Sequence, residues 1–280
     1  MVSVPLNAVT TGFARAFAAL FFASVTSSAA AADWRYGIGI HDFAVPDVDS
    51  HTYGVNARVA VDSRPESGPH VFGSFDIFWD RDKDHLDNDH IPIWWQSHLG
   101  ADGDFWRGDR LRLGWTADLN TRMNTVSSIE RQITALPAVV AGYDGRVLRA
   151  SVEAGAGWFF LHIDDDAPRE QGYDRNELEN NTFAYAATAK VALKLGESWT
   201  VSGQARTWWD SHTTLERYYQ AALRFDASRW LGNAAMKNPT VVLSADYYQY
   251  NLDVYNHASG PPVLRWNDDR MIRLYLEAKW

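Results

Sequence analysis

The stretch that decides the fold class is Ile-Arg-Leu-Tyr-Leu-Glu-Ala-Lys-Trp, residues 272–280. Apolar residues occupy alternate positions from Ile272 to Trp280, and the charged residues Arg273, Glu277 and Lys279 lie between them. Successive side chains of a β-strand point to opposite faces, so this stretch predicts a strand with one apolar and one polar face.

The same alternation recurs along the chain in twelve segments. They are residues 34–43, 52–62, 70–79, 91–101, 110–121, 134–143, 146–160, 182–195, 199–209, 214–226, 240–254 and 270–280. A soluble sandwich also alternates, but most of these segments have the ten or so residues that a tilted strand needs to cross a bilayer. Tryptophans also gather near their ends, where a membrane interface favours such rings. These tryptophans are Trp79, Trp94, Trp95, Trp199, Trp208, Trp209 and Trp280.

The final strand, Ile272–Trp280, which ends on an aromatic residue, resembles the last strand of bacterial outer-membrane β-barrel proteins. The resemblance implies an all-β fold, a closed antiparallel up-and-down transmembrane β-barrel. Counting gives about twelve strands, with 10–14 as the range. It also implies the cell outer membrane as location, with outer-membrane lipid, lipopolysaccharide, periplasmic chaperones and the barrel-assembly machinery as partners.

The N-terminal residues 1–32 read as a secretory signal peptide. Arg15 precedes an apolar run over residues 16–23, and four alanines occupy positions 29–32. This order of basic, apolar and small residues is what secretion and cleavage require. The mature chain, residues 33–280, is then one barrel domain, and its lack of cysteine suits an oxidising compartment.

Composition excludes several classes of protein. No apolar stretch approaches the ~18–20 residues of a membrane helix, and a net charge of −9 argues against a nucleic-acid partner. No cofactor is expected. The acidic run from Asp80 to His90 could supply oxygen ligands to a metal ion. Arg81 and Lys83 interrupt it, however, so a solvated outer loop is the preferred interpretation and no metal site is predicted.

The polar faces of the strands are expected to line the lumen. The predicted lumen or binding residues are Arg58, Asp76, Arg112, Asp118, Arg149, Glu153, Lys190, Arg206, Glu216, Arg224, Asp246, Arg273 and Glu277, with Arg35, Lys194, Asp226 and Lys279 on the same faces. Both signs of charge are present. The side chains could line a narrow aqueous path, or they could pair across the lumen and fill it.

The connections between the strands alternate in length. Asp144 and Gly145 form a tight-hairpin signal, whereas the connections at the other end are mostly long, as in barrels with short periplasmic turns. Residues 227–238 are longer than this rhythm predicts, and Pro137 should weaken its strand because it lacks an N–H. Residues 125–136 could form a short loop helix, but an extended hairpin is favoured.

The sequence also allows an enzymatic interpretation. Asp210 and His212 follow one strand, and Asp80 and Asp82 lie at the end of another. A carboxylate–histidine pair can activate water, and this arrangement is loosely similar to omptins, outer-membrane proteases with an Asp–His pair and an Asp pair in the barrel mouth. Rim acids and histidines are more often solvated, so these four are secondary candidates for catalytic residues.

The functional prediction is a narrow channel for passive diffusion of small hydrophilic solutes, rather than an enzyme. One alternative is a solitary translocator-type or structural barrel with a filled lumen, similar to twelve-stranded autotransporter domains. The other is an omptin-like outer-membrane hydrolase that uses the rim residues.

Overall fold

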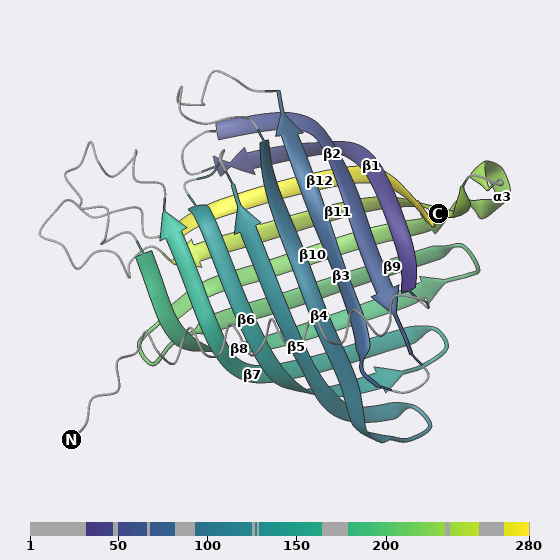
Figure 1. Ribbon diagram of the computed structural model, residues 1–280, viewed down its shortest axis with the longest axis horizontal. Coiled ribbons are helices and arrows are strands. Elements are labelled where there is room, and N and C mark those ends of the chain that lie inside the picture. Colours follow the sequence, from purple (N-terminus) through teal and green to yellow (C-terminus); the bar gives the residue numbers. More distant parts are fainter. Residues whose placement is uncertain are drawn as a thin grey trace, which may run out of the picture.

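The computed structural model describes residues 32–46, 50–65, 68–81, 93–124, 127, 129–163, 179–232, 236–251 and 266–279. In these residues twelve strands close into an antiparallel barrel (Figure 1). The strands are β1 (Ala32–Val45), β2 (Ser50–Ser63), β3 (His70–Asp80), β4 (Ile93–Arg107), β5 (Leu111–Met123), β6 (Ile129–Asp144), β7 (Leu148–Ile163), β8 (Glu179–Leu195), β9 (Trp199–Trp209), β10 (Thr214–Asp226), β11 (Lys237–Asn251) and β12 (Trp266–Lys279). Residues 1–31 of the predicted signal peptide, and most of the acidic run after Asp80, lie outside the described residues, whereas Ala32 is the first residue of β1.

Each strand pairs with its neighbours in sequence, and the ring closes between the first and last strands. β1 pairs with β12 over a continuous register from Arg35 opposite Lys279 to Ala44 opposite Arg270. The predicted closed, up-and-down, twelve-stranded barrel is therefore confirmed, and each predicted segment overlaps one observed strand.

The apolar faces of the strands point away from the barrel interior. Ile38 and Ile272, for example, are 69% and 54% exposed, and many other large hydrophobic side chains share this outer surface. Such an outward apolar band is what lipid contact requires, and it excludes a sandwich that buries these faces between two sheets. In the described part of the chain, no helix has the length and apolar character to cross a membrane.

Short connections gather at the end where β1 begins and β12 ends. Because outer-membrane barrels have short periplasmic turns, we call this the periplasmic end and the opposite one the outer end. The long connection after β10 contains the one-turn helix α3 (Ser228–Leu231), which lies at the same end as the C-terminus in Figure 1. Trp230 of α3 stacks on Phe225, with ring centroids 5.0 Å apart.

The strand β6 continues through Pro137 and begins at Ile129, so the helix considered for residues 125–136 does not form over 129–136. Pro137 pairs with Ala117 on one side. On the other side, a Cβ at Gly155 or Gly157 of β7 would lie about 2 Å from a β6 carbonyl oxygen (2.1 and 1.9 Å). These glycines allow the two strands to approach closely. The β6–β7 register passes from Ala135 opposite Trp158 to Ala138 opposite Gly155, so Pro137 lies at a break in this ladder, where its missing N–H is tolerated.

Candidate functional site

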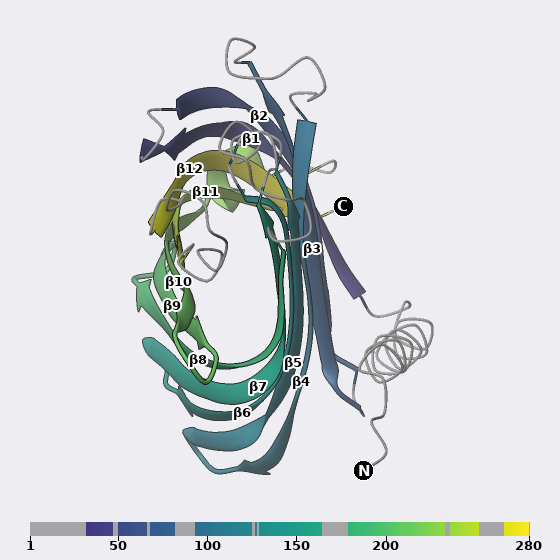
Figure 2. The same ribbon diagram turned by 90° about the vertical axis from the view of Figure 1, so that its left-hand side faces the viewer.

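The candidate site is the space inside the ring of strands (Figure 2). Buried polar and charged side chains of the strands line this space. The structure places all thirteen predicted lumen residues on inward-facing positions. Eleven of them line two adjoining cavities, and Glu216 and Glu277 are buried against arginines. Within the described residues, no group of three or more His, Asp or Glu side chains is arranged to hold a metal ion.

Two cavities occupy the periplasmic half and the middle of the lumen. The first has a volume of about 850 Å³ and is lined by Arg112 and Arg149 among others. The second, of about 240 Å³, lies deeper and shares Lys190, Gln204 and Gln220 with the first. Their common residues show that one polar space extends from the periplasmic mouth to mid-barrel.

A ladder of ion pairs follows the wall of the second cavity. Arg273 of β12 contacts Asp76 of β3 at 3.2 Å and Asp246 of β11 at 3.0 Å. Arg58 of β2 also pairs with Asp76, at 2.5 Å. Tyr218 donates its hydroxyl to Asp246 at 2.7 Å. Both carboxylates are therefore fully engaged, as buried charges must be, and they hold the wall of the lumen in place.

Nearer the periplasmic end, one carboxylate serves several arginines. The carboxylate of Glu277 accepts hydrogen bonds from the guanidinium groups of Arg35, at 3.2 Å, and Arg224, at 2.8 Å. The guanidinium group of Arg58 lies 3.9 Å from it. Three guanidinium groups around a single buried carboxylate leave an excess of positive charge at this level of the lumen.

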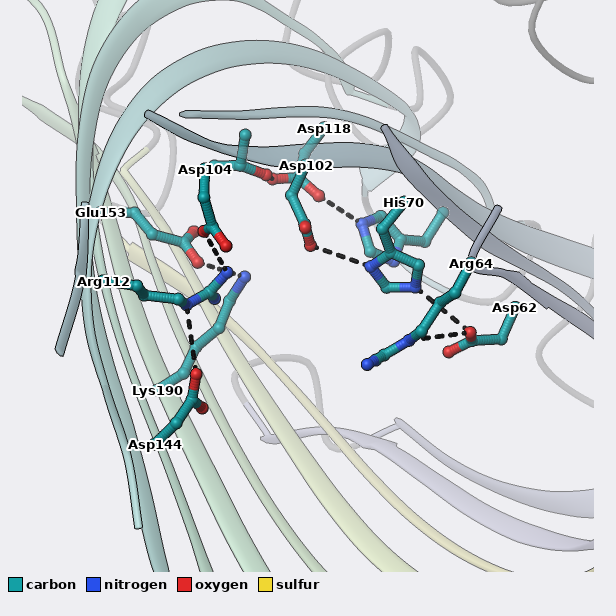
Figure 3. A network of polar contacts seen from close by, with 12 residues as sticks. Asp62, Arg64, His70, Asp102, Asp104, Arg112, Asp118, Asp144, Glu153 and Lys190 are labelled. Carbon is teal, nitrogen blue, oxygen red and sulfur yellow. Dashed lines mark hydrogen bonds and ion pairs between the residues drawn. The ribbon is translucent and has the colours of Figure 1, made fainter. Parts of the chain in front are cut away.

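The adjoining wall, formed by β2, β3, β4 and β5, carries histidines that contact carboxylates (Figure 3). His70 lies between Asp62, at 3.2 Å, and Asp102, at 3.1 Å. His98 contacts Asp118 at 2.7 Å. The acids of this wall are thus paired locally.

The same network continues onto β5, β7 and β8. Arg112 lies 3.6 Å from Asp104 and 3.9 Å from Asp144, and Lys190 lies 2.7 Å from Glu153 (Figure 3). Most lumen carboxylates therefore already have a cationic or histidine partner.

The outer half of the lumen is crossed by a buried ion pair. Arg122 of β5 binds Asp269 of β12 at 2.7 Å and donates to the hydroxyl of Tyr250 at 2.7 Å, while Ser127 donates to Asp269 at 2.9 Å. β5 and β12 are separated by four strands on the shorter way around the ring, so these contacts span the interior. We call Arg122, Ser127, Tyr250 and Asp269 the Arg122 bridge.

A second set of contacts crosses the lumen beside the bridge. Gln132 of β6 donates to Glu216 of β10 and accepts from Tyr250 at 3.2 Å, and Arg206 of β9 pairs with Glu216 at 3.0 Å. The guanidinium of Arg122 also lies within 6 Å of three ring centroids, a favourable cation–π distance. These rings belong to Phe43, Trp94 and Tyr248.

Two clusters of buried apolar side chains complete this layer. The larger contains Ile129, Leu136, Ala138, Phe159, Leu161, Ile163, Ala184, Ala186, Trp208, Leu215 and Tyr250, and the smaller contains Phe43, Val45, Phe78, Trp94 and Met271. Both interpretations of the lumen charges thus apply, at different depths. Side chains fill the outer half, and a polar space occupies the rest.

The proposed rim catalytic residues are engaged in other contacts. Asp80 is buried, accepts from Thr52 at 3.2 Å and contacts His41 at 2.9 Å. Asp210 accepts the backbone N–H groups of His212 and Thr213, both at 2.7 Å, which is a turn-stabilising arrangement. Asp82 lies outside the described residues. The described contacts show no carboxylate oriented toward the ring of the exposed His212, so they do not assemble a hydrolytic site.

Sequence reasoning missed Arg122 and Asp269, the two charged partners of the bridge. The predicted strands ended at residue 121 and began at residue 270, so each partner lay one residue beyond. Extending the alternation by one step would have placed both inward, since Asp118 and Arg122 share one face of β5. No sequence signal indicates that they meet across the lumen.

No protein-family model and no curated protein matches the chain. Among solved structures it is similar to the KdgM porin, with 9% identity over 87% of this chain and 99% of that one, at a TM-score of 0.44. It is also similar to the NanC porin (10%, 87% and 100%, 0.46) and to outer membrane phospholipase A from Escherichia coli (11%, 88% and 90%, 0.40). Identities of 9–11% and TM-scores below 0.5 carry no argument about this chain. Its fold and its site are therefore established by its own strand pairing and side-chain contacts.

Proposed function

We propose that the protein is an outer-membrane channel for small hydrophilic solutes, open toward the periplasmic end and constricted at the Arg122 bridge. The observation that carries this proposal is the pair of adjoining polar cavities, about 850 and 240 Å³. The larger lies within the ~300–1,000 Å³ typical of small-molecule sites. A structural barrel needs no such space, whereas a solute path does.

The membrane assignment belongs to the same proposal. The outward apolar band supports insertion into a bilayer, and the outer membrane is the one that barrels of this kind occupy. Outer-membrane lipid and lipopolysaccharide would cover the band, and periplasmic chaperones with the barrel-assembly machinery would deliver the chain.

The experiment is planar-bilayer recording of refolded protein, with β-sheet content verified by circular dichroism. The test variant is Arg122→Ala combined with Asp269→Ala, which removes both charges of the bridge and leaves neither buried alone. The control is Arg131→Ala, which removes an arginine with a half-exposed side chain from β6. We expect small discrete conductance steps from the wild type and the control, and larger steps from the double variant. A double variant that is folded but gives no discrete conductance steps would overturn the channel proposal.

A filled-lumen structural barrel is the second candidate, and the Arg122 bridge with its two apolar clusters favours it. It predicts that the wild type and the double variant are both electrically silent while folded. The same recordings therefore distinguish the two functions. If conductance steps appear only in the double variant, the protein is a channel that the Arg122 bridge holds closed in the wild type.

A further inference from the structure

Three basic side chains at the periplasmic mouth have no carboxylate partner. Arg146 lies in the β7 entry turn, Arg149 on β7 and Lys194 on β8, and none forms an ion pair with any residue that the structure describes. Most other lumen charges are paired, as Lys190 is with Glu153 at 2.7 Å. The three side chains therefore place positive charge without an ion-pair partner among the described residues at the periplasmic mouth.

Strand register places these residues beside a further arginine. Lys194 pairs with Thr200 of β9, which in turn pairs with Arg224 of β10. Arg149 pairs with Ala192, two residues before Lys194 on the same inward face. The basic groups thus lie at nearly one height on β7, β8 and β10 and in the turn before β7, with Thr200 of β9 between Lys194 and Arg224. We call Arg146, Arg149, Lys194 and Arg224 the cationic row.

A cavity of about 510 Å³ lies against the cationic row. Its basic lining residues are Arg35, Arg146, Arg149, Lys194, Arg224 and Lys279, and its acidic ones are Glu197 and Asp226. Three of the basic groups have carboxylate partners that do not line the cavity: Lys279 pairs with Asp33, and Arg35 and Arg224 share Glu277. With these two acids included, six basic groups face four acidic ones, in a chain whose net charge is −9.

The contacts recorded for the two acids of this cavity are with residues outside the cationic row. Asp226 accepts the backbone N–H of Ser228 at 2.9 Å, and Glu197 faces Arg229 at 3.6 Å in an exposed pair. Glu277, the nearby buried carboxylate, is already shared by three arginines. The local field is therefore positive, and the low-dielectric walls of a barrel concentrate it in the lumen.

We propose that the cationic row is a binding site for anionic solutes that carry carboxylate or phosphate groups, and that it makes the channel prefer anions. Guanidinium groups suit both ligands because they bind either in a bidentate manner. The part about ion preference rests on the proposed channel function, whereas binding at the mouth does not require conduction.

The test uses the full mature barrel with Arg149→Gln and Lys194→Gln combined. The matched control, Arg110→Gln, removes one positive charge from an exposed turn at the same end that lines none of these cavities. Reversal potentials in a KCl gradient give the permeability ratio of chloride to potassium. We expect a ratio of about 3 or more for wild type and control, falling toward 1 in the double variant. A wild-type ratio of 1 or less, or a ratio unchanged by the double substitution, would overturn the ion preference while leaving the channel intact.

Calorimetric titration of the refolded proteins provides a second measurement that is independent of conduction. Inorganic phosphate and succinate are the two probes, and they distinguish a phosphate ligand from a carboxylate one. We expect at least one probe to bind wild type and control, with affinity reduced about tenfold in the double variant because two direct contacts are lost. Equal binding, or no binding, by all three proteins would refute the site, whether or not the barrel conducts.

Discussion

Replacing Arg122 with methionine should destabilise the barrel, because the Asp269 carboxylate would stay buried without its cation. Within the described part of the chain, the side-chain contact that Asp269 then keeps is the hydroxyl of Ser127. The hydrogen bond to Tyr250 is lost as well. Methionine preserves much of the side-chain volume, so the cost reflects the missing charge rather than a large cavity.

The magnitude follows from the burial of the pair, whose side chains are 5% and 0% exposed. Removing one partner of such a pair costs about 3–5 kcal/mol of unfolding free energy. Replacing both partners with apolar residues is often close to neutral. We therefore expect Arg122→Met to lose about 3–5 kcal/mol, and Arg122→Met with Asp269→Leu to come within about 1 kcal/mol of wild type.

Urea unfolding from lipid vesicles, followed by the fluorescence of the 13 tryptophans, measures these differences. The control, Arg131→Met, lies on the outward, partly exposed side of β6 and should change stability by less than about 0.5 kcal/mol. A loss below about 1 kcal/mol for Arg122→Met would show that the bridge does not hold the folded barrel together, and the proposed constriction would lose its basis.

Other features of the barrel give simpler predictions. Leu274→Arg puts a charge on the outward apolar face and should cost about 2–4 kcal/mol if that face contacts lipid near the bilayer midplane; a neutral result in vesicle unfolding would contradict the lipid contact. Asp210→Ala removes two turn hydrogen bonds and should cost about 1 kcal/mol in the same assay, whereas His212→Ala should change neither stability nor any hydrolysis of peptide or lipid substrates. Gly196, with φ +69°, has space for a side chain but a left-handed backbone, so Gly196→Val should cost about 1–2 kcal/mol; unchanged stability would refute strain at this turn.

Alternation of apolar and polar residues was sufficient to predict the barrel. It located all twelve strands because a lipid-facing wall and a polar lumen each require the same residue type at every second position. Strand ends were less predictable. β4, for instance, extends to Arg107, six residues beyond the predicted end, because Trp106 and Arg107 still pair with β5 after a bulge between Asp104 and Trp106.

The interior of the barrel could be predicted only in part. The alternation of side chains along a strand shows which ones share a face, and it placed Arg273 and Glu277 on the inward face of β12, where the structure has them. It says nothing about which residues meet across the lumen, because those distances depend on the curvature of the whole ring. The contact between Arg122 and Asp269 is therefore a property of the closed barrel and not of any local pattern. The prediction that Trp94 and Trp208 lie at the membrane interface is wrong, because both side chains are buried inside the barrel, on the inward faces of their strands.

The Arg122 bridge also has a consequence for biogenesis. Arg122 lies on β5 and Asp269 on β12. These two strands face each other across the lumen only when β1 has paired with β12 and closed the ring. Before that seam forms, the arginine and the aspartate have no fixed partner and stay hydrated. Ring closure and the exclusion of water from the outer half of the lumen are thus one event. In a chain arrested before β1 pairs with β12, the interior side chains would stay hydrated and accessible to a protease or a water-soluble label.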